Sequence, residues 1–144
     1  MPGSPASLRP APAVVTTSPR LRTEVLETAL AYRGVPYRFG GDDPASGFDC
    51  SGFIRFVLAT HAVTVPRTTT EQFQIGRQVG ARDVKAGDLV FFSTVAPGAS
   101  HVGLALSANE FVHAPAASGV VRVERMDASY WQSRFVGARR LFSE

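Results

Sequence analysis

The sequence predicts an α+β fold, with helices in the N-terminal half and an antiparallel sheet packed on them. Apolar residues recur at helical spacing from Leu21 to Leu30 and again from Cys50 to Thr60. After residue 80 the pattern changes to short apolar runs bounded by turn residues, which is typical of strands. Because these strands follow one another along the chain, we expect them to form one sheet.

The first helix is expected to begin at Ser18 and Pro19, since Ser is a favoured N-cap and Pro a favoured first helical residue. Gly34 can end it in the left-handed region. A polar, irregular surface loop follows, and then a helix from Cys50 to about Thr60 that is apolar on most faces and therefore buried.

A capping box formed by Thr68 and Glu71 predicts a third, short helix through Gln72 to Ile75, which Gly76 can stop. The C-terminal half should contain several strands and one helical turn. We expect strands at Leu89–Phe92, His101–Ser107, Glu110–Ala114, Val120–Glu124 and Phe135–Leu141, a hairpin turn at Ala108-Asn109, and a helical turn within Asp127–Gln132.

Composition indicates one domain, since 144 residues can bury a core of ordinary size. Residues 1–19 are rich in Pro, Ala, Ser and Thr, which predicts a flexible tail before a domain at 20–144. The tail lacks the continuous apolar region of an intact secretory signal, although it could follow a signal or lipid anchor that has been removed. No run approaches the roughly 20 apolar residues that span a bilayer.

Charge and cysteine content narrow the function further. The net charge of +3 favours anionic partners, but Lys and Arg are scattered and no basic helix or zinc finger is present, which argues against nucleic acid. Cys50 is the only cysteine, so no internal disulfide can form.

Cys50 lies at a predicted junction of loop and helix, where unpaired backbone N–H groups stabilise a thiolate. We therefore expect a lowered thiol pKa and a reaction with iodoacetamide well below pH 8. Gly52 beside it should leave room for a substrate. The alternative is that Cys50 is a small buried apolar residue with no chemical role.

A nucleophilic cysteine needs a base within hydrogen-bond reach. In a hairpin centred on Ala108, His113 lies opposite Gly103 and diagonal to His101, so the two imidazoles can meet. His101 would then take the proton of Cys50, and His113 would orient His101. His61 lies about 16 Å along the helix from Cys50, which makes it a helix-end residue instead.

The histidine face of this hairpin also carries small residues, Gly103 and Ala105, so we expect it to be open and to hold Cys50, while the opposite face packs on the core. Two alternatives remain. The histidines could be unrelated residues on a half-exposed hairpin, or they could bind zinc together with Cys50, although no short metal-binding spacing is present.

Three polar residues near Cys50 are further candidates. Tyr37 could donate to an oxyanion together with the Cys50 N–H, or it could simply pack in a long loop. Asp49 can cap the helix, and because its charge would oppose a thiolate, its carboxylate should point away, toward a substrate amine. Ser51 could contact substrate or be only a helix-end hydroxyl.

The segments PYRFGG, FDCSGF, VPRTTTEQ, AGDLVFF, HVGLAL, FVHAP and FVGARRL resemble, in this order, the NlpC-type cell-wall cysteine peptidases. The resemblance covers about residue 22 to the C-terminus. It implies a papain-like fold with Cys50 as nucleophile, His101 as base and His113 as orienting residue. Tyr37 matches a residue near the oxyanion, and Asp49 and Ser51 match residues that contact the free amine of the wall peptide. Phe39 stands where the family often has Trp.

The resemblance further implies hydrolysis of peptidoglycan stem peptides, often at the bond between D-glutamate and a diamino acid, without a cofactor or metal. We therefore expect an extracytoplasmic, monomeric enzyme that acts on peptidoglycan or muropeptides. Two alternatives stay open: a thiol acyltransferase or amidase acting on another substrate, and a catalytically silent wall-binding domain.

Overall fold

The computed structural model describes residues 19–116 and 119–143. Most of the predicted tail, together with the predicted N-cap Ser18, lies outside the described residues. The helices are α2 (Pro19–Ala31), α3 (Cys50–Thr60), α4 (Thr69–Gln72), the 3₁₀ helix η1 (Ala81–Asp83) and α5 (Ser129–Gln132). The strands are β1 (Asp42–Asp43), β2 (Gly47–Phe48), β3 (Arg77–Val79), β4 (Leu89–Phe92), β5 (His101–Ala105), β6 (Glu110–His113), β7 (Arg122–Arg125) and β8 (Phe135–Arg140).

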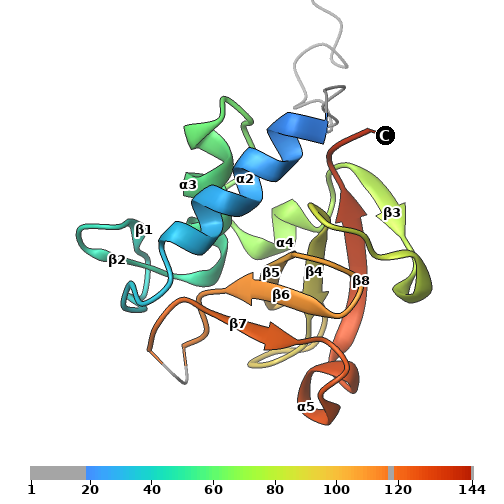
Figure 1. Ribbon diagram of the computed structural model, residues 1–144. Helices are drawn as coiled ribbons and strands as arrows, with labels where there is room; N and C mark the ends of the chain where they lie inside the picture. The colour runs from blue at the N-terminus through green and yellow to red at the C-terminus, as the bar shows by residue number, and fades with distance from the viewer. Residues whose placement is uncertain (1–18, 117–118, 144) are drawn as a thin grey trace, which may run out of the picture.

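A six-stranded sheet forms the centre of the domain, in the order β3-β8-β4-β5-β6-β7. All of its neighbouring strands run antiparallel. Figure 1 shows α2 and α3 together on one side of the molecule and the short α5 at the other end. The predicted α+β architecture is therefore confirmed. Strand β3, helix η1 and the small β1-β2 hairpin in the predicted irregular loop were not foreseen.

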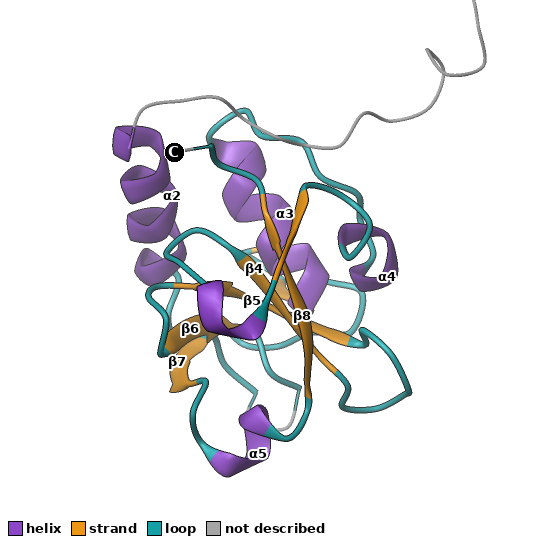
Figure 2. Ribbon diagram, turned by 90° about the vertical axis from the view of Figure 1, so that its right-hand side faces the viewer, coloured by secondary structure: helices purple, strands orange, loops and turns teal. Residues whose placement is uncertain are grey.

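The two faces of the sheet pack against different sets of side chains. Val102 and Leu104 of β5 join the main core, which contains the buried residues of α3. Ala105, on the opposite face, packs in a second cluster with Phe111 and Trp131. Figure 2 shows the sheet between α3 and α5. Both faces of β5 are thus covered, so this strand is buried along its whole length.

This packing corrects the prediction for the histidine face of the hairpin. That face is closed by aromatic side chains, because the absence of a side chain at Gly103 lets the Phe111 ring pack there; a Cβ on Gly103 would lie 2.6 Å from Phe111 Cδ2. Cys50 packs against the main core. Small residues on a strand made room for a neighbouring ring and not for an open surface.

Helix α3 begins where predicted and is capped by Asp49, whose Oδ1 accepts a hydrogen bond from the Gly52 N–H at 2.7 Å. The prediction that Gly52 leaves room for a substrate is wrong. A Cβ on Gly52 would lie 2.1 Å from the backbone oxygen of Gly41 and 2.8 Å from Asp49 Oδ1. Gly52 therefore allows the loop before α3 to approach the helix closely.

A buried ion pair joins Asp88, directly before β4, to Arg140 at the end of β8. Arg140 Nε and Nη2 donate to the two carboxylate oxygens of Asp88 at 2.8 and 2.9 Å, and Nη2 also donates to the backbone oxygen of Asp83. Asp88 is 1% exposed and Arg140 8%. No helix within the described residues is long and apolar enough to cross a membrane.

Candidate active site

The Cys50 side chain lies at the first turn of α3 and is partly buried. Its sulfur lies 3.4 Å from the Thr69 hydroxyl, and the backbone N–H groups of Val102 and Ser51 also bond to it. Val102 follows His101 directly, so the thiol lies against the beginning of β5. Cys50, His101 and His113 all lie within the described residues. Among these residues the structure shows no hydrogen bond between the thiol and either imidazole.

Burial raises the pKa of the Cys50 thiol, and the negative charge of Asp49 adds to this effect, while bonds from Thr69, Val102 and Ser51 lower the pKa in part. The predicted lowered thiol pKa is therefore wrong. Desolvation outweighs the stabilisation of a thiolate by nearby donors, so the thiol is protonated at neutral pH.

His101 and His113 come together as the hairpin register predicts. Leu104 pairs with Val112. Continuing this antiparallel register by one residue puts Gly103 opposite His113. His101 Nε2 lies 2.7 Å from His113 Nδ1. On its other side, His113 Nε2 lies 2.9 Å from Glu124 Oε2. The result is a hydrogen-bonded chain that runs across three neighbouring strands, β5, β6 and β7.

Both imidazoles are neutral at physiological pH. Burial, together with the neighbouring His113, lowers the pKa of His101 to about 3. Burial also lowers the pKa of His113 to about 4, although the Glu124 carboxylate opposes this effect. The aromatic cluster explains the burial, because the Trp131 ring is stacked on His101 at a centroid distance of 5.5 Å.

Asp49 forms an ion pair that the sequence did not reveal. Arg67 Nη1 and Nη2 donate to the two Asp49 carboxylate oxygens at 3.1 and 2.9 Å, and Nη1 also donates to the Ser51 hydroxyl at 2.9 Å. The Asp49 carboxylate faces Arg67. Arg67 also balances the charge of Asp49 beside the thiol.

Tyr37 lies in the loop before α3 and packs against the main core. Burial raises the pKa of its phenol, and the charges of Cys50 and Asp49 raise it further, which places the phenol in the electrostatic field of the candidate nucleophile. Phe39, two residues later, is 91% exposed. The loop therefore presents one aromatic side chain to the site and another to solvent.

His61 is the C-cap of α3, as expected, and its Nε2 lies 2.6 Å from the Thr28 hydroxyl of α2. It links two helices and takes no part in the histidine pair. Cys50, His101 and His113 do not form a cluster that could hold a metal ion, and no other such cluster of His, Cys, Asp or Glu occurs in residues 19–116 and 119–143.

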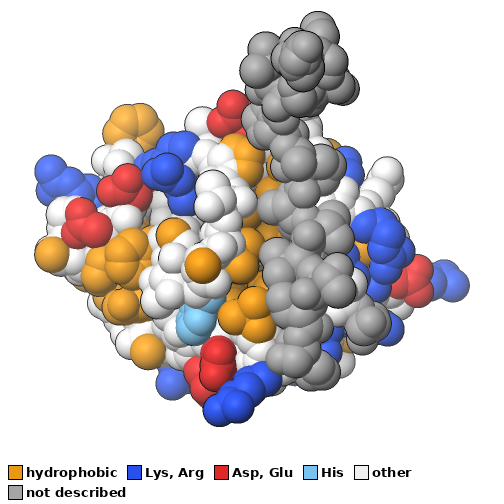
Figure 3. Space-filling view, turned by 90° about the horizontal axis from the view of Figure 1, so that it is seen from above, with side chains coloured by type: hydrophobic (Ala, Val, Ile, Leu, Met, Phe, Trp, Pro, Cys, Tyr) orange, Lys and Arg blue, Asp and Glu red, His pale blue; other side chains and the backbone are white. Residues whose placement is uncertain are grey.

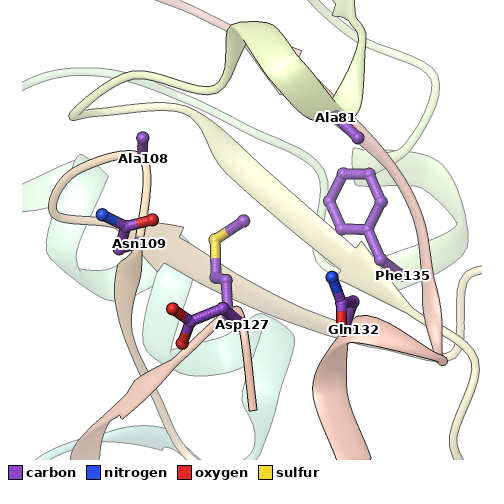
Figure 4. A pocket seen from close by; sticks show the side chains of 7 residues that line it. Ala81, Ala108, Asn109, Asp127, Gln132 and Phe135 are labelled. Carbon is purple, nitrogen blue, oxygen red and sulfur yellow. The ribbon is translucent and has the colours of Figure 1, made fainter. Parts of the chain in front are cut away.

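A cavity of about 180 Å³ lies at the far end of the β5-β6 hairpin from the histidine pair. Figure 4 shows that the hairpin turn, α5 and the beginning of β8 surround it. Its lining consists of Ala81, Ala108, Asn109, Met126, Asp127, Gln132 and Phe135. None of these residues belongs to the candidate site.

On the face in Figure 3, the visible Lys and Arg side chains form separate groups among acidic and apolar ones.

Sequence reasoning missed four residues that contact the candidate site: Arg67, Thr69, Glu124 and Trp131. Arg67 and Thr69 lie within the family segment VPRTTTEQ, which was a signal for them, and strand pairing was a signal for Glu124. In β7 Glu124 pairs with Phe111, so it lies diagonal to His113, just as His113 lies diagonal to His101. Arg67, Thr69 and Trp131 reach the site from a loop and two short helices, and their position depends on tertiary packing.

Comparison with known proteins gives the same family as the sequence motifs. The model of the NlpC/P60 family matches residues 34–140. The chain is 38% identical over 118 residues to a protein named Gamma-DL-glutamyl hydrolase from Bacillus subtilis (strain 168), covering 81% of this chain and 28% of the relative. It is 36% identical over 124 residues to the murein DD-endopeptidase MepS/murein LD-carboxypeptidase of Escherichia coli (strain K12), covering 85% of this chain and 64% of that protein.

Among solved structures, a protein from Staphylococcus aureus subsp. aureus Mu50, described as similar to lipoprotein, NLP/P60 family, superimposes with a TM-score of 0.80 at 28% identity. The match covers 96% of this chain and 47% of that chain. The chain thus spans less than two thirds of each of these three proteins, and it matches them over most of its own length. This chain belongs to the NlpC/P60 family and has its papain-like fold.

Proposed function

We propose that this domain is a cysteine peptidase that hydrolyses amide bonds in peptidoglycan stem peptides. One observation carries the proposal: the thiol at the first turn of α3 bonds to the strand that begins with His101, and His101 bonds in turn to His113. This arrangement has the three parts of a nucleophile, a base and an orienting group. The name of the murein endopeptidase from Escherichia coli supports a substrate in the cell wall.

In the first step, the Cys50 sulfur attacks the carbonyl carbon of the scissile amide while its proton passes to His101. A neutral thiol and a neutral imidazole at rest suit general-base catalysis, in which proton transfer accompanies attack. The C–N bond then breaks, His101 gives the proton to the leaving amine, and a thioester remains on Cys50.

In the second step, water attacks the thioester carbonyl with His101 as base. The carboxylic acid leaves, and the proton returns to the thiol. In both steps negative charge develops on the carbonyl oxygen, and we propose that the Cys50 N–H and the Tyr37 hydroxyl donate to it. The electrostatic interaction of the Tyr37 phenol with Cys50 supports this role.

For the scissile bond, we propose the amide between D-glutamate and the following diamino acid. The name of the Bacillus relative, a glutamyl hydrolase, supports a glutamyl bond. The Escherichia coli relative is instead named a DD-endopeptidase, which indicates a different bond. Asp49 and Ser51 would contact the free amine of the stem peptide, with Arg67 holding both side chains in place. Because peptidoglycan lies outside the cytoplasm, we propose that the domain acts in the cell envelope or outside the cell.

The test is incubation of the purified protein with two defined sugar-free stem peptides, an uncross-linked tetrapeptide and its cross-linked dimer, followed by mass spectrometry. We expect both substrates to lose an alanyl-glutamate fragment, and Cys50→Ala to leave both intact. Cleavage of the dimer alone, into two monomers, would identify a DD-endopeptidase and contradict the proposed bond. If wild type and Cys50→Ala leave both substrates whole, the peptidase proposal fails.

A further inference from the structure

Three hydrogen bonds meet at Glu124, behind the histidine pair. Its Oε2 accepts from His113 Nε2 and from Arg122 Nε, both at 2.9 Å, and its Oε1 accepts from Trp131 Nε1, also at 2.9 Å. These donors come from β6, β7 and α5. Because they approach both carboxylate oxygens from different directions, they hold the carboxylate in one position.

The bonds at Glu124 decide where each imidazole carries its proton. The bonds from Trp131, His113 and Arg122 lower the pKa of the Glu124 carboxyl, although burial raises it, and the net shift is downward. At neutral pH Glu124 is therefore a carboxylate, which can only accept. Consequently His113 Nε2 must donate its proton to Glu124.

The same logic extends to His101. Since His113 is neutral, it has one ring proton, and its Nδ1 can only accept. His101 Nε2, at 2.7 Å, must then be the donor in the bond between the histidines. His101 is neutral as well, so its own Nδ1 keeps a free lone pair. It is the only ring nitrogen of the pair that is able to take a proton without breaking this chain.

We propose that Glu124 is a positioning residue that fixes the tautomer of His101 through His113, making His101 Nδ1 the basic nitrogen. The catalytic consequence rests on the proposed function, because a base at His101 matters only if Cys50 is the nucleophile. The proton arrangement itself does not depend on that function and can be measured separately.

The direct test is ¹⁵N NMR of the imidazoles at pH 7 in the full chain. In the wild type we expect both His101 and His113 to carry their protons on Nε2. A proton on His113 Nδ1 in the wild type would overturn the proposal, whatever the activity. This measurement also separates the two ideas, because a protein that cuts no muropeptide can still show the expected tautomers.

Glu124→Met tests the role of the carboxylate, because Met has a similar length and accepts no strong hydrogen bond. We expect a mixture of His113 tautomers and a fall in kcat of about 100-fold or more with little change in KM, since a wrong tautomer removes the base. The matched control is Arg125→Met, an exposed residue of the same strand, which should change kcat by less than about threefold. Wild-type tautomers and kcat in Glu124→Met would contradict the proposal.

A second variant distinguishes positioning from folding. In Glu124→Gln only one of the two terminal atoms is an acceptor oxygen. The amide therefore cannot accept from both Trp131 and His113. Adding Trp131→Phe removes the indole donor, so the amide oxygen can turn to His113. We expect Glu124→Gln/Trp131→Phe to restore the His113 tautomer and to keep kcat within about tenfold of Trp131→Phe alone. Failure to restore the tautomer in a folded double variant would count against the proposal.

Discussion

Acid should destabilise this domain through its two buried histidines. In the unfolded chain a histidine has a pKa of about 6.5, whereas burial lowers the folded pKa values to about 3 for His101 and about 4 for His113. Between these values the unfolded state binds more protons than the folded state. Stability is therefore fully present above the unfolded pKa and falls as the pH drops below about 6.5.

The size of the effect follows from these pKa values. Between pH 7 and pH 5, each histidine should cost about 2 kcal/mol, so the pair costs roughly 4 kcal/mol. A domain of this size typically has only about 5–15 kcal/mol of stability. The loss would therefore be a large part of the total.

Urea unfolding at pH 7, 6 and 5 measures the effect, with the fluorescence of Trp131 as the signal, because this buried residue is the only tryptophan. We expect the midpoint to fall with pH while the slope stays constant. Replacing one histidine, as in His113→Asn, should halve the loss. A free energy of unfolding that stays within about 0.5 kcal/mol from pH 7 to pH 5 would refute the reasoning.

Three further predictions concern single positions. Thr69→Val removes a bond that lowers the thiol pKa, so the iodoacetamide reaction of Cys50 should shift to higher pH, while the exposed neighbour Thr70→Val should leave the profile unchanged. An unshifted Thr69→Val profile would show that this bond has no effect on the thiol. Asp88→Asn removes the buried carboxylate charge that pairs with the Arg140 guanidinium, which should cost about 3 kcal/mol in urea unfolding; a loss below about 1 kcal/mol would contradict this. Gly52→Ala forces a Cβ against backbone, so we expect a loss of about 3 kcal/mol or more, and thermal unfolding at the wild-type temperature would disprove the steric argument.

Local patterns predicted much of the fold. The apolar periodicity located α3 with the bounds Cys50–Thr60, and the turn at Ala108-Asn109 gave a register that brings His101 and His113 together. Thr68 accepts from the Glu71 N–H as the capping box predicts, although the helix ends earlier, at Gln72. These features depend on residues a few positions apart, so their physics is contained in short segments.

The environment of the candidate site could not be predicted in the same way. Whether Gly103 faces solvent or a ring depends on where Phe111 and Trp131 pack, and these contacts join distant parts of the chain. The prediction of a lowered thiol pKa failed for the same reason. The donors at the helix N-terminus can be read from sequence, but the burial that outweighs them requires the whole fold. The ion pair of Asp49 with Arg67 likewise spans 18 positions.

Because strand β5 separates two packed clusters, the reactive groups of the site are surrounded by different sets of side chains. The thiol packs with the main core, whereas the imidazoles lie among the aromatic side chains of the second cluster. Substitutions in the second cluster can therefore alter the basicity of the imidazoles without touching the residues that surround the sulfur. A domain built in this way can adjust its working pH in evolution by changes on one side of the sheet, while the nucleophilic helix stays the same.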